Sequence, residues 1–136
     1  MCFEVDPAYP DVMVATHNIL CWKRLERAGE HWLSPYLRMM YTFGKEVSSA
    51  MDEPDGNEIA QGLHAYSCEG RAERRACMGE RVFPAIIPRG AICRYSKRSE
   101  ELVSTSLAVY RTLKDALAAC AQTKVSRARV LPRKSV

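Results

Sequence analysis

The apolar segment at residues 81–87 constrains the fold more than any other part of the sequence. It contains Val, Phe, Ala and two Ile residues, and Gly79 and Pro88-Arg89-Gly90 bound it. A short apolar run between turn-forming residues is typical of a strand in the middle of a sheet. Pro84 lies inside the run and removes a backbone hydrogen-bond donor. We therefore expect this strand either to lie at a sheet edge or to bulge at Pro84.

Two further strands are expected before that run. Residues 16–25 are short and rich in Ile and Trp, which predicts a strand, and residues 26–30 with Gly29 predict the turn that follows. Residues 31–43 carry many large apolar side chains, but Ser34-Pro35 interrupts them and argues against one continuous helix. We expect a loop there that leads into a second strand.

The middle and the end of the sequence combine strands with helices. Residues 59–67 predict a turn into a short strand. Residues 69–78 predict a helix, because small apolar residues follow one side of it, and Gly79 is its expected end. Residues 102–109 alternate apolar and small polar side chains, which is the period of a strand, and a helix is expected from there through Cys120.

These elements predict one compact α+β domain over residues 1–123, with a mostly antiparallel sheet and two or three helices. The length of 136 residues suits a single core. Residues 51–58 concentrate acidic side chains with Pro, Gly and Asn, which indicates a turn or a mobile loop. Residues 124–136 contain five basic residues and no acidic one, and we expect this tail to be frayed.

Composition argues against several classes of protein. No stretch approaches the roughly 18 to 20 consecutive apolar residues of a membrane helix. The first twelve residues carry three acidic side chains and no basic one, unlike a secretory leader. We expect a cytoplasmic protein whose six cysteines are free thiols. No metal site is expected, and one assembled from Cys68, Cys77 and His64 is the less favoured alternative to buried thiols.

Charge is divided unevenly along the sequence. Residues 1–68 contain five basic and ten acidic residues, a net charge of −5, whereas residues 69–136 contain fifteen basic and six acidic residues, a net charge of +9. This asymmetry points to an acidic partner, either a nucleic acid, a nucleotide or an acidic protein surface. The predicted helix contributes three arginines, Arg71, Arg74 and Arg75. A solvated helix face paired with Glu73 is the plainer account of those three.

Two other residues are binding candidates. His64 follows Gly62 closely, so its ring could hydrogen-bond a ligand or donate a proton near neutral pH; a buried histidine satisfied by backbone groups is the alternative. Arg89 precedes Gly90 and could present its guanidinium and nearby backbone N–H groups to a phosphate, although a simple turn explains the Pro-Arg-Gly run equally well. Common nucleotide-binding and hydrolase motifs are missing from the sequence.

Six short motifs occur in order along residues 1–113. They are Met1-Cys2-Phe3 with Asp6, residues 18–23 (Asn-Ile-Leu-Cys-Trp-Lys), Ser34-Pro35-Tyr36, Phe43-Gly44-Lys45, residues 62–66 (Gly-Leu-His-Ala-Tyr) and residues 87–91 (Ile-Pro-Arg-Gly-Ala). Together they resemble a group of small phage and prophage proteins that begin Met-Cys-Leu and carry Gly-Phe-His-Ser and Ile-Pro-Lys-Gly-Ser motifs. The resemblance implies an accessory protein that acts inside a bacterial host, and it implies no chemistry.

The layout also resembles, more faintly, the ADP-ribosyltransferase fold. That resemblance puts Lys23 or Arg24 on the first strand of the fold, residues 62–67 at the second position and residues 86–91 at the third. The fourth position should carry a glutamate that stabilises the oxocarbenium ion formed from NAD.

The fourth position is where this chain departs from the transferase pattern. At that position the sequence has Ser104 and Ser106 instead of a glutamate. Glu100 and Glu101 lie just upstream and would serve, together with His64, only if the strand register shifts. An inactive nucleotide-binding relic is therefore favoured over an active transferase.

We predict a protein that acts by binding rather than by catalysis and that needs no cofactor. The expected partner is a bacterial host protein or nucleic acid, such as a component of host defence or of nucleic-acid machinery, engaged through the basic second half. NAD enters only under the transferase alternative. Self-association is left open, and no membrane partner is expected.

Overall fold

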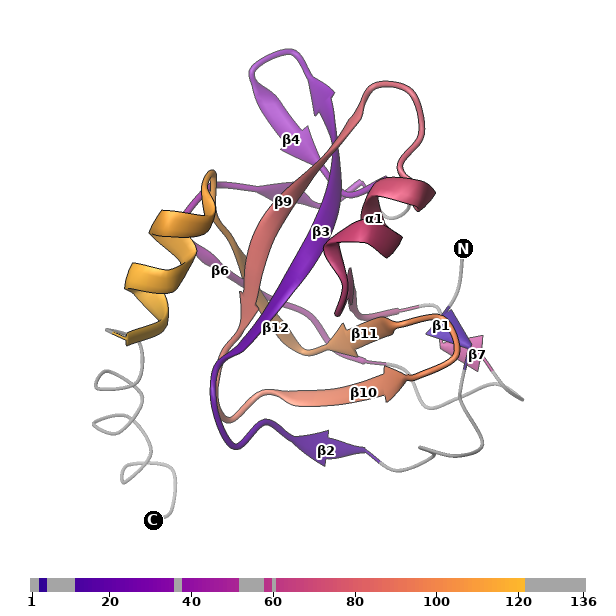
Figure 1. Cartoon of the computed structure of the whole chain (residues 1–136), viewed down its shortest axis with the longest axis vertical. Coiled ribbons are helices and arrows are strands. Elements are labelled where there is room, and N and C mark those ends of the chain that lie inside the picture. The colour runs from indigo at the N-terminus through magenta and orange to yellow at the C-terminus, as the bar shows by residue number, and fades with distance from the viewer. Residues whose placement is uncertain (1–2, 5–11, 36–37, 52–57, 60, 122–136) are drawn as a thin grey trace.

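Every strand pair among the described residues is antiparallel, and all but one belong to a single sheet (Figure 1). This computed structural model describes residues 3–4, 12–35, 38–51, 58–59 and 61–121. The large sheet contains β2 (Met13–Val14), β3 (Ile19–Ala28), β4 (His31–Leu33), β5 (Met40–Tyr41), β6 (Glu46–Ser48), β8 (Leu63–Tyr66), β9 (Glu80–Ile87), β10 (Ile92–Ser96), β11 (Glu101–Ser104) and β12 (Ser106–Val109). A separate pair is formed by β1 (Phe3–Glu4) and β7 (Glu58–Ile59).

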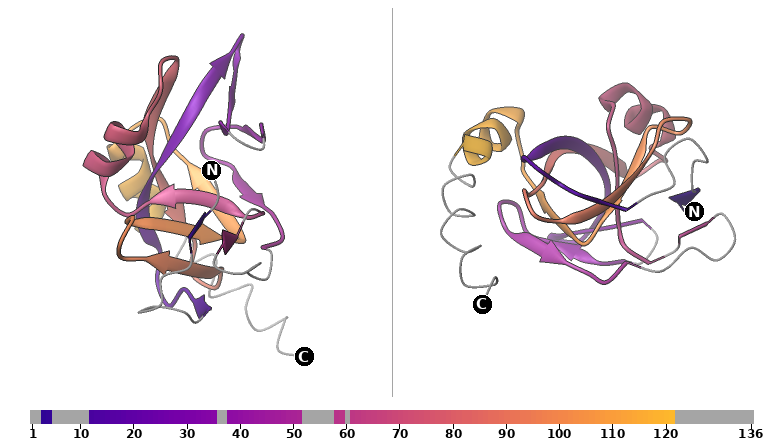
Figure 2. Two further views of the ribbon diagram at one scale, coloured as in Figure 1. Left: turned by 90° about the vertical axis from the view of Figure 1, so that its right-hand side faces the viewer. Right: turned by 90° about the horizontal axis from the view of Figure 1, so that it is seen from below.

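The large sheet curls so strongly that one bent strand pairs on both sides of the curl (Figure 2). Its order is β2-β10-β11-β8-β3-β9-β12-β6, and only Thr105 separates β11 from β12. Because β11 pairs with β8 while β12 pairs with β9, the chain crosses from one side of the curl to the other at that residue. The Thr105 side chain helps hold the bend, since its Oγ1 accepts a hydrogen bond of 3.1 Å from the backbone N–H of Ile92.

The core lies inside the curl. β3 and β9 are the longest strands and pair along most of their length, from Ile19 opposite Ile87 to Glu26 opposite Glu80. Large side chains from β9 and its neighbours fill one end of the interior. Trp32, Phe43 and Phe83 form an aromatic cluster there, in which the ring centroids of Trp32 and Phe43 each lie 5.0 Å from that of Phe83. The tilted and edge-on arrangements of these rings are the favoured ones for aromatic packing.

Two helices among the described residues flank the sheet on opposite sides (Figure 1). α1 (Glu69–Arg75) packs against β3, β8 and β9 through the buried Ala72. The other helix, at residues 113–121, buries Ala116, and Asn18 Nδ2 donates a 2.7 Å hydrogen bond to the backbone oxygen of Cys120. The prediction of a mostly antiparallel sheet with two or three helices is confirmed in this outline.

Boundaries in the first half differ from the sequence prediction. The first long strand starts three residues later than expected, and it continues through most of the predicted turn at 26–30. Pairing of residues 26–28 with β4 explains the extension, and only Gly29, with a φ of 63°, takes a turn conformation that favours glycine. The expected loop over 31–43 contains two short strands, β4 and β5, on either side of Ser34-Pro35.

The predicted helix at 69–78 is too long at its end. α1 ends at Arg75, and Ala76 already has an extended backbone with a ψ of 133°. Gly79 therefore does not end the helix. It lies in the turn that leads into β9, where its φ is 86° and the Glu80 N–H donates to the Cys77 oxygen.

Pro84 lies neither at a sheet edge nor in a bulge, which were the two predicted ways for the sheet to accommodate it. Its strand, β9, lies between β3 and β12 rather than at a sheet edge. The Pro84 oxygen accepts a 2.8 Å hydrogen bond from the Tyr110 N–H, just past the last residue of β12. A residue's N–H and C=O point to the same side of an antiparallel strand. The missing donor of Pro84 therefore faces the point where β12 leaves the sheet, and no central ladder bond is lost.

The second half agrees more closely with the sequence. The strands predicted at 59–67, 81–87 and 102–109 correspond to β8, β9 and the β11–β12 pair, and the helix through Cys120 is present. β10 was not predicted at all. Residues 52–57, in the predicted acidic loop, and the basic tail at 124–136 lie outside the described residues.

Candidate functional site

A cavity of about 290 Å³ lies where β3 and β8 separate. The two strands share one paired position, Trp22 with Tyr66. Beyond it, the cavity is lined mainly by apolar side chains, among them Met39 and Leu63. Gly62 also lines it. A Cβ added at Gly62 would lie 2.5 Å from Val103 Cγ2, and its φ is 143°, so this wall requires glycine.

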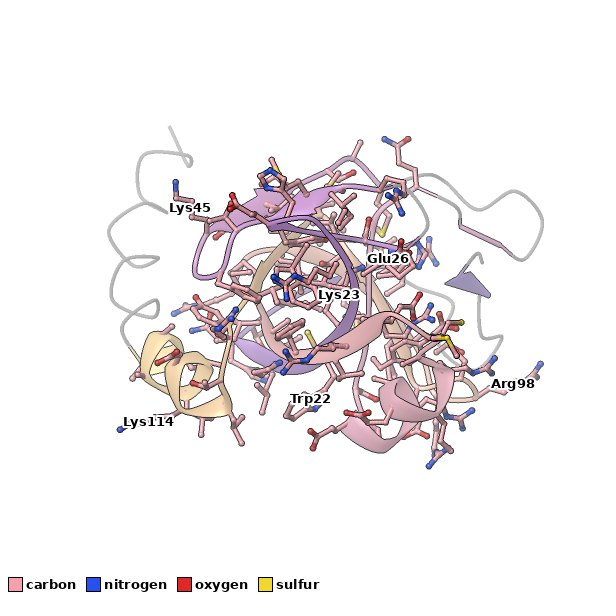
Figure 3. The ribbon with its side chains drawn as sticks, turned by 90° about the horizontal axis from the view of Figure 1, so that it is seen from above. Trp22, Lys23, Glu26, Lys45, Arg98 and Lys114 are labelled. Atoms are coloured by element: carbon pink, nitrogen blue, oxygen red, sulfur yellow. The ribbon has the colours of Figure 1, made fainter. Side chains whose placement is uncertain are left out.

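Lys23 reaches into the cavity from the inside of the sheet. Alternation along β3 directs Cys21, Lys23 and Leu25 inward, whereas Trp22 lies on the outside (Figure 3). Only 6% of Lys23 is exposed. Its Nζ donates a 2.5 Å hydrogen bond to the backbone oxygen of His64. This ammonium therefore bridges the two strands at the point where their backbone pairing stops.

The buried position of Lys23 disfavours its charged form. Burial, with a further contribution from the positive charge of Arg24, lowers the pKa of Lys23 from 10.5 to about 8. Lys23 still carries a proton at neutral pH. The neighbouring Cys21 cannot balance that charge, because burial raises the pKa of its thiol to about 12 and keeps the sulfur neutral.

Tyr41 faces the same cavity from β5. It is 4% exposed, and its hydroxyl has no hydrogen-bond partner among the described residues. Burial raises the pKa of this hydroxyl, so it remains a neutral donor. The Lys23 Nζ lies 5.6 Å from the centroid of the Tyr41 ring. A buried polar group without a partner is uncommon and marks a place where a ligand or water can bind.

Two carboxylates line the cavity, and they differ in their surroundings. Glu80 forms a 3.0 Å ion pair with Arg24 and also accepts a 2.9 Å hydrogen bond from the Cys77 N–H. Glu101, the first residue of β11, is 8% exposed and stands opposite Tyr66 in the strand register.

The structure brings some of the predicted catalytic candidates together and separates another. His64 and Glu101 line the same cavity, and no shift in register is needed for this. Glu100 lies outside it, in the turn between β10 and β11, where its φ is 59° and its carboxylate is 3.3 Å from Arg71 NH2. Ser104 is occupied within the sheet, since its Oγ donates to the Ser106 oxygen at 2.7 Å.

The predicted binding arginines fall into two places. Arg74 and Arg75 are exposed on α1, and Arg71 beside them pairs with Glu100. Arg89 lies at the far side of the sheet, beside the helix at 113–121, where its backbone N–H donates to Asn18 Oδ1 at 2.9 Å. It therefore does not belong to the α1 group.

We call the positively charged region at α1 the basic surface. The Arg71–Glu100 pair holds the β10–β11 turn, which carries Lys97 and Arg98, against the beginning of α1 (Figure 3). The residues of the basic surface are Arg71, Arg74, Arg75, Lys97 and Arg98. Three acidic residues lie among these five, Glu69, Glu73 and Glu100, which leaves a net charge of +2.

Sequence reasoning missed the importance of Lys23 and Tyr41. Tyr41 was not singled out as a binding residue, and Lys23 was a site candidate only through the resemblance to transferases. A lysine between Cys21 and Leu25, at an inward position of an alternating strand, is the signal that could have found the site. Five cysteines of the described residues are free, as predicted. Within those same residues, no three His, Cys, Asp or Glu side chains are grouped as metal ligands.

Comparison with known proteins gives no family assignment. No family model, curated protein or solved structure matches this chain. In the part of the chain that the structure describes, no helix has the length and apolar character that crossing a membrane requires.

Proposed function

We propose that this protein binds an acidic protein of a bacterial host through the basic surface. The observation that carries the proposal is the exposed pair Arg74 and Arg75 on α1, the helix that Arg71 ties to Glu100 in the turn with Lys97 and Arg98. Arginine is enriched at protein interfaces and pairs well with carboxylates. The resemblance to phage accessory proteins supports action in the cytoplasm of the host.

A protein partner is favoured over a nucleic acid. Nucleic-acid binding draws most of its affinity from neutralising many phosphates, and a net charge of +2 on the basic surface is modest for that task. Among the residues whose side-chain exposure the structure describes, every Phe, Tyr and Trp is buried or half-buried, which leaves none fully exposed for base stacking. Met78, which is fully exposed just beyond α1, adds an apolar contact of the kind common at protein interfaces.

Affinity capture from bacterial lysate with two matched charge reversals tests this proposal. We expect a host protein to be retained at low salt and released as salt rises, because exposed charges are screened. Arg74→Glu with Arg75→Glu should abolish retention. Lys45→Glu with Lys114→Glu changes the net charge by the same amount away from α1 (Figure 3) and should leave retention intact.

Two results would overturn the proposal. If the two double variants retained the host protein equally well, the basic surface would not be the binding surface. Loss of retention after nuclease treatment would identify a nucleic acid as the partner instead.

A transferase-like or nucleotide-binding role is the second candidate, because His64 and Glu101 line one cavity. This candidate predicts transfer of labelled ADP-ribose from NAD, lost in Glu101→Gln and retained in Glu100→Gln. Binding of NAD without transfer would instead indicate the inactive relic. A lysate with neither labelling nor NAD binding would retire this candidate.

A further inference from the structure

Among the described residues, the buried ammonium of Lys23 forms no ion pair, although the Glu101 carboxylate lines the same cavity. Of the ion pairs formed by the described residues, none includes Lys23, and its one hydrogen bond goes to a backbone oxygen. Arg24, which adds positive charge beside it, is itself neutralised by Glu80. A buried charge without a counter-charge is strongly disfavoured, so an anion that reached Lys23 would gain much from the contact.

The Tyr41 hydroxyl offers a second hydrogen-bond donor in the same cavity. It is buried and has no partner among the described residues. Together, Lys23 and Tyr41 can present one charged and one neutral donor to an incoming oxygen. Arg24 also lines the cavity, but its guanidinium is held by Glu80, at 3.0 Å, and by the oxygen of Arg75, at 2.7 Å.

The other lining residues and the volume of the cavity determine the polarity and the size of the rest of the ligand. Met39, Leu63 and Pro35 form an apolar part of the cavity wall. A volume of about 290 Å³ corresponds to about ten non-hydrogen atoms, at roughly 30 Å³ for each water-sized unit.

We propose that this cavity binds a small monocarboxylate with an apolar body, whose carboxylate contacts Lys23 Nζ and Tyr41 Oη while its apolar part packs against Met39 and Leu63. Arg24 neutralises Glu80, and Glu101 adds a negative charge to the lining, so the cavity favours a ligand with a single negative charge. A phosphate monoester carries up to two negative charges and would need more hydrogen-bond donors than Lys23 and Tyr41 supply. The site is separate from the basic surface and does not depend on the partner proposed above.

Benzoate and hexanoate are suitable probes, and benzyl alcohol and hexanol are the matched uncharged compounds. We expect the carboxylates to perturb the NMR signals of residues around Lys23 and Tyr41 in the full chain, and to bind at least tenfold more tightly than the alcohols. A tenfold ratio corresponds to about 1.4 kcal/mol, which a single hydrogen bond to a charged group can supply. Phenyl phosphate should bind more weakly than benzoate.

Variants locate the binding. Lys23→Met should weaken benzoate binding at least tenfold, and Tyr41→Phe several-fold, whereas Lys45→Met should have no effect because Lys45 is exposed elsewhere. Lys23→Met keeps an apolar side chain of similar length, and its fold is checked by the NMR spectrum. Tyr41→Phe, which leaves the lysine in place, provides the second variant.

Several outcomes would overturn the proposal. They are unchanged benzoate affinity in Lys23→Met, equal affinity for benzoate and benzyl alcohol, tighter binding of phenyl phosphate, and no binding of either carboxylate at millimolar concentration. Failure here is distinguishable from failure of the proposed function. Arg74→Glu with Arg75→Glu should leave benzoate binding unchanged, and Lys23→Met should leave capture of the host protein unchanged.

Discussion

The inside of the curled sheet has an apolar end and a polar end, and they are built on the same strand. At one end Leu25 of β3 belongs to the same apolar core as the aromatic cluster around Phe83, and the guanidinium group of Arg81 lies against the cluster, 5.2 Å from the centroid of the Phe83 ring. Two residues earlier on β3, Lys23 enters a cavity with Tyr41 and Glu101. The two ends adjoin, because Phe83 stands opposite Lys23 in the strand register, and the cavity lies at the second end. The difference indicates that stability is concentrated at the apolar end and binding capacity at the polar end.

Removing the centre of the aromatic cluster should have the largest effect. Phe83 is 2% exposed, and Phe83→Ala is expected to lower the free energy of unfolding by about 3–5 kcal/mol through lost burial and the cavity left behind. Urea denaturation followed by circular dichroism measures it. Phe43→Ala, at a half-buried position of the same cluster, is the matched variant and should cost less. Equal costs would show that the cluster is not centred on Phe83.

Removing the buried charge should act in the opposite direction. Lys23→Met is expected to raise the free energy of unfolding at pH 7 by about 1–3 kcal/mol, because it removes an uncompensated buried ammonium. The pKa of Lys23 is lowered from 10.5 to about 8. Between these values the unfolded chain keeps a proton that the folded chain has lost, so wild-type stability rises relative to Lys23→Met as the pH rises.

Urea denaturation at pH 7, 9 and 10 tests the pH dependence of that difference. The advantage of Lys23→Met should be constant below pH 8 and shrink between pH 8 and 10.5. Cys21 and Tyr41, whose raised pKa values act in the opposite sense, are present in both proteins, so their effects largely cancel. Lys45→Met should change little at any pH. A loss of stability in Lys23→Met at pH 7 would mean that the ammonium has a compensating partner.

The smallest expected effect is at the Tyr41 hydroxyl. Tyr41→Phe removes a buried group that has no partner among the described residues, so the free energy of unfolding should rise by about 1 kcal/mol or less. Tyr110→Phe, at a half-exposed position, is the control and should change nothing measurable. A loss of more than about 1 kcal/mol in Tyr41→Phe would show that the hydroxyl is already satisfied.

The apolar end was the more predictable one. The run at 81–87 and the alternation at 102–109 carry a strand signal in a few consecutive residues, and both are strands in the structure. β10 was missed because its residues include Arg94 and Tyr95 without a clear apolar alternation. Its strand state depends on pairing with β11, which a local pattern does not contain.

The polar end was predicted only in fragments. His64 and Glu101 were singled out separately, and nothing in their 37-residue separation indicates that they meet in one cavity. Their meeting depends on the antiparallel register of β8 and β11, which puts Glu101 opposite Tyr66 and Val103 opposite His64. Glu100, one residue away, turns outward to Arg71. A difference of one position thus separated a cavity residue from a surface residue.

The bent strand at residues 101–109 also governs when the chain can fold. It completes the sheet by pairing on one side with β8 and on the other with β9, and it is the last strand of the described chain to be synthesised. Until it emerges from the ribosome, Phe83 and Leu63 on the growing polypeptide lack the strand that covers them. Pairings between distant segments form slowly, and uncovered apolar strands attract other chains. We therefore expect this protein to need protection from aggregation until translation has passed residue 109.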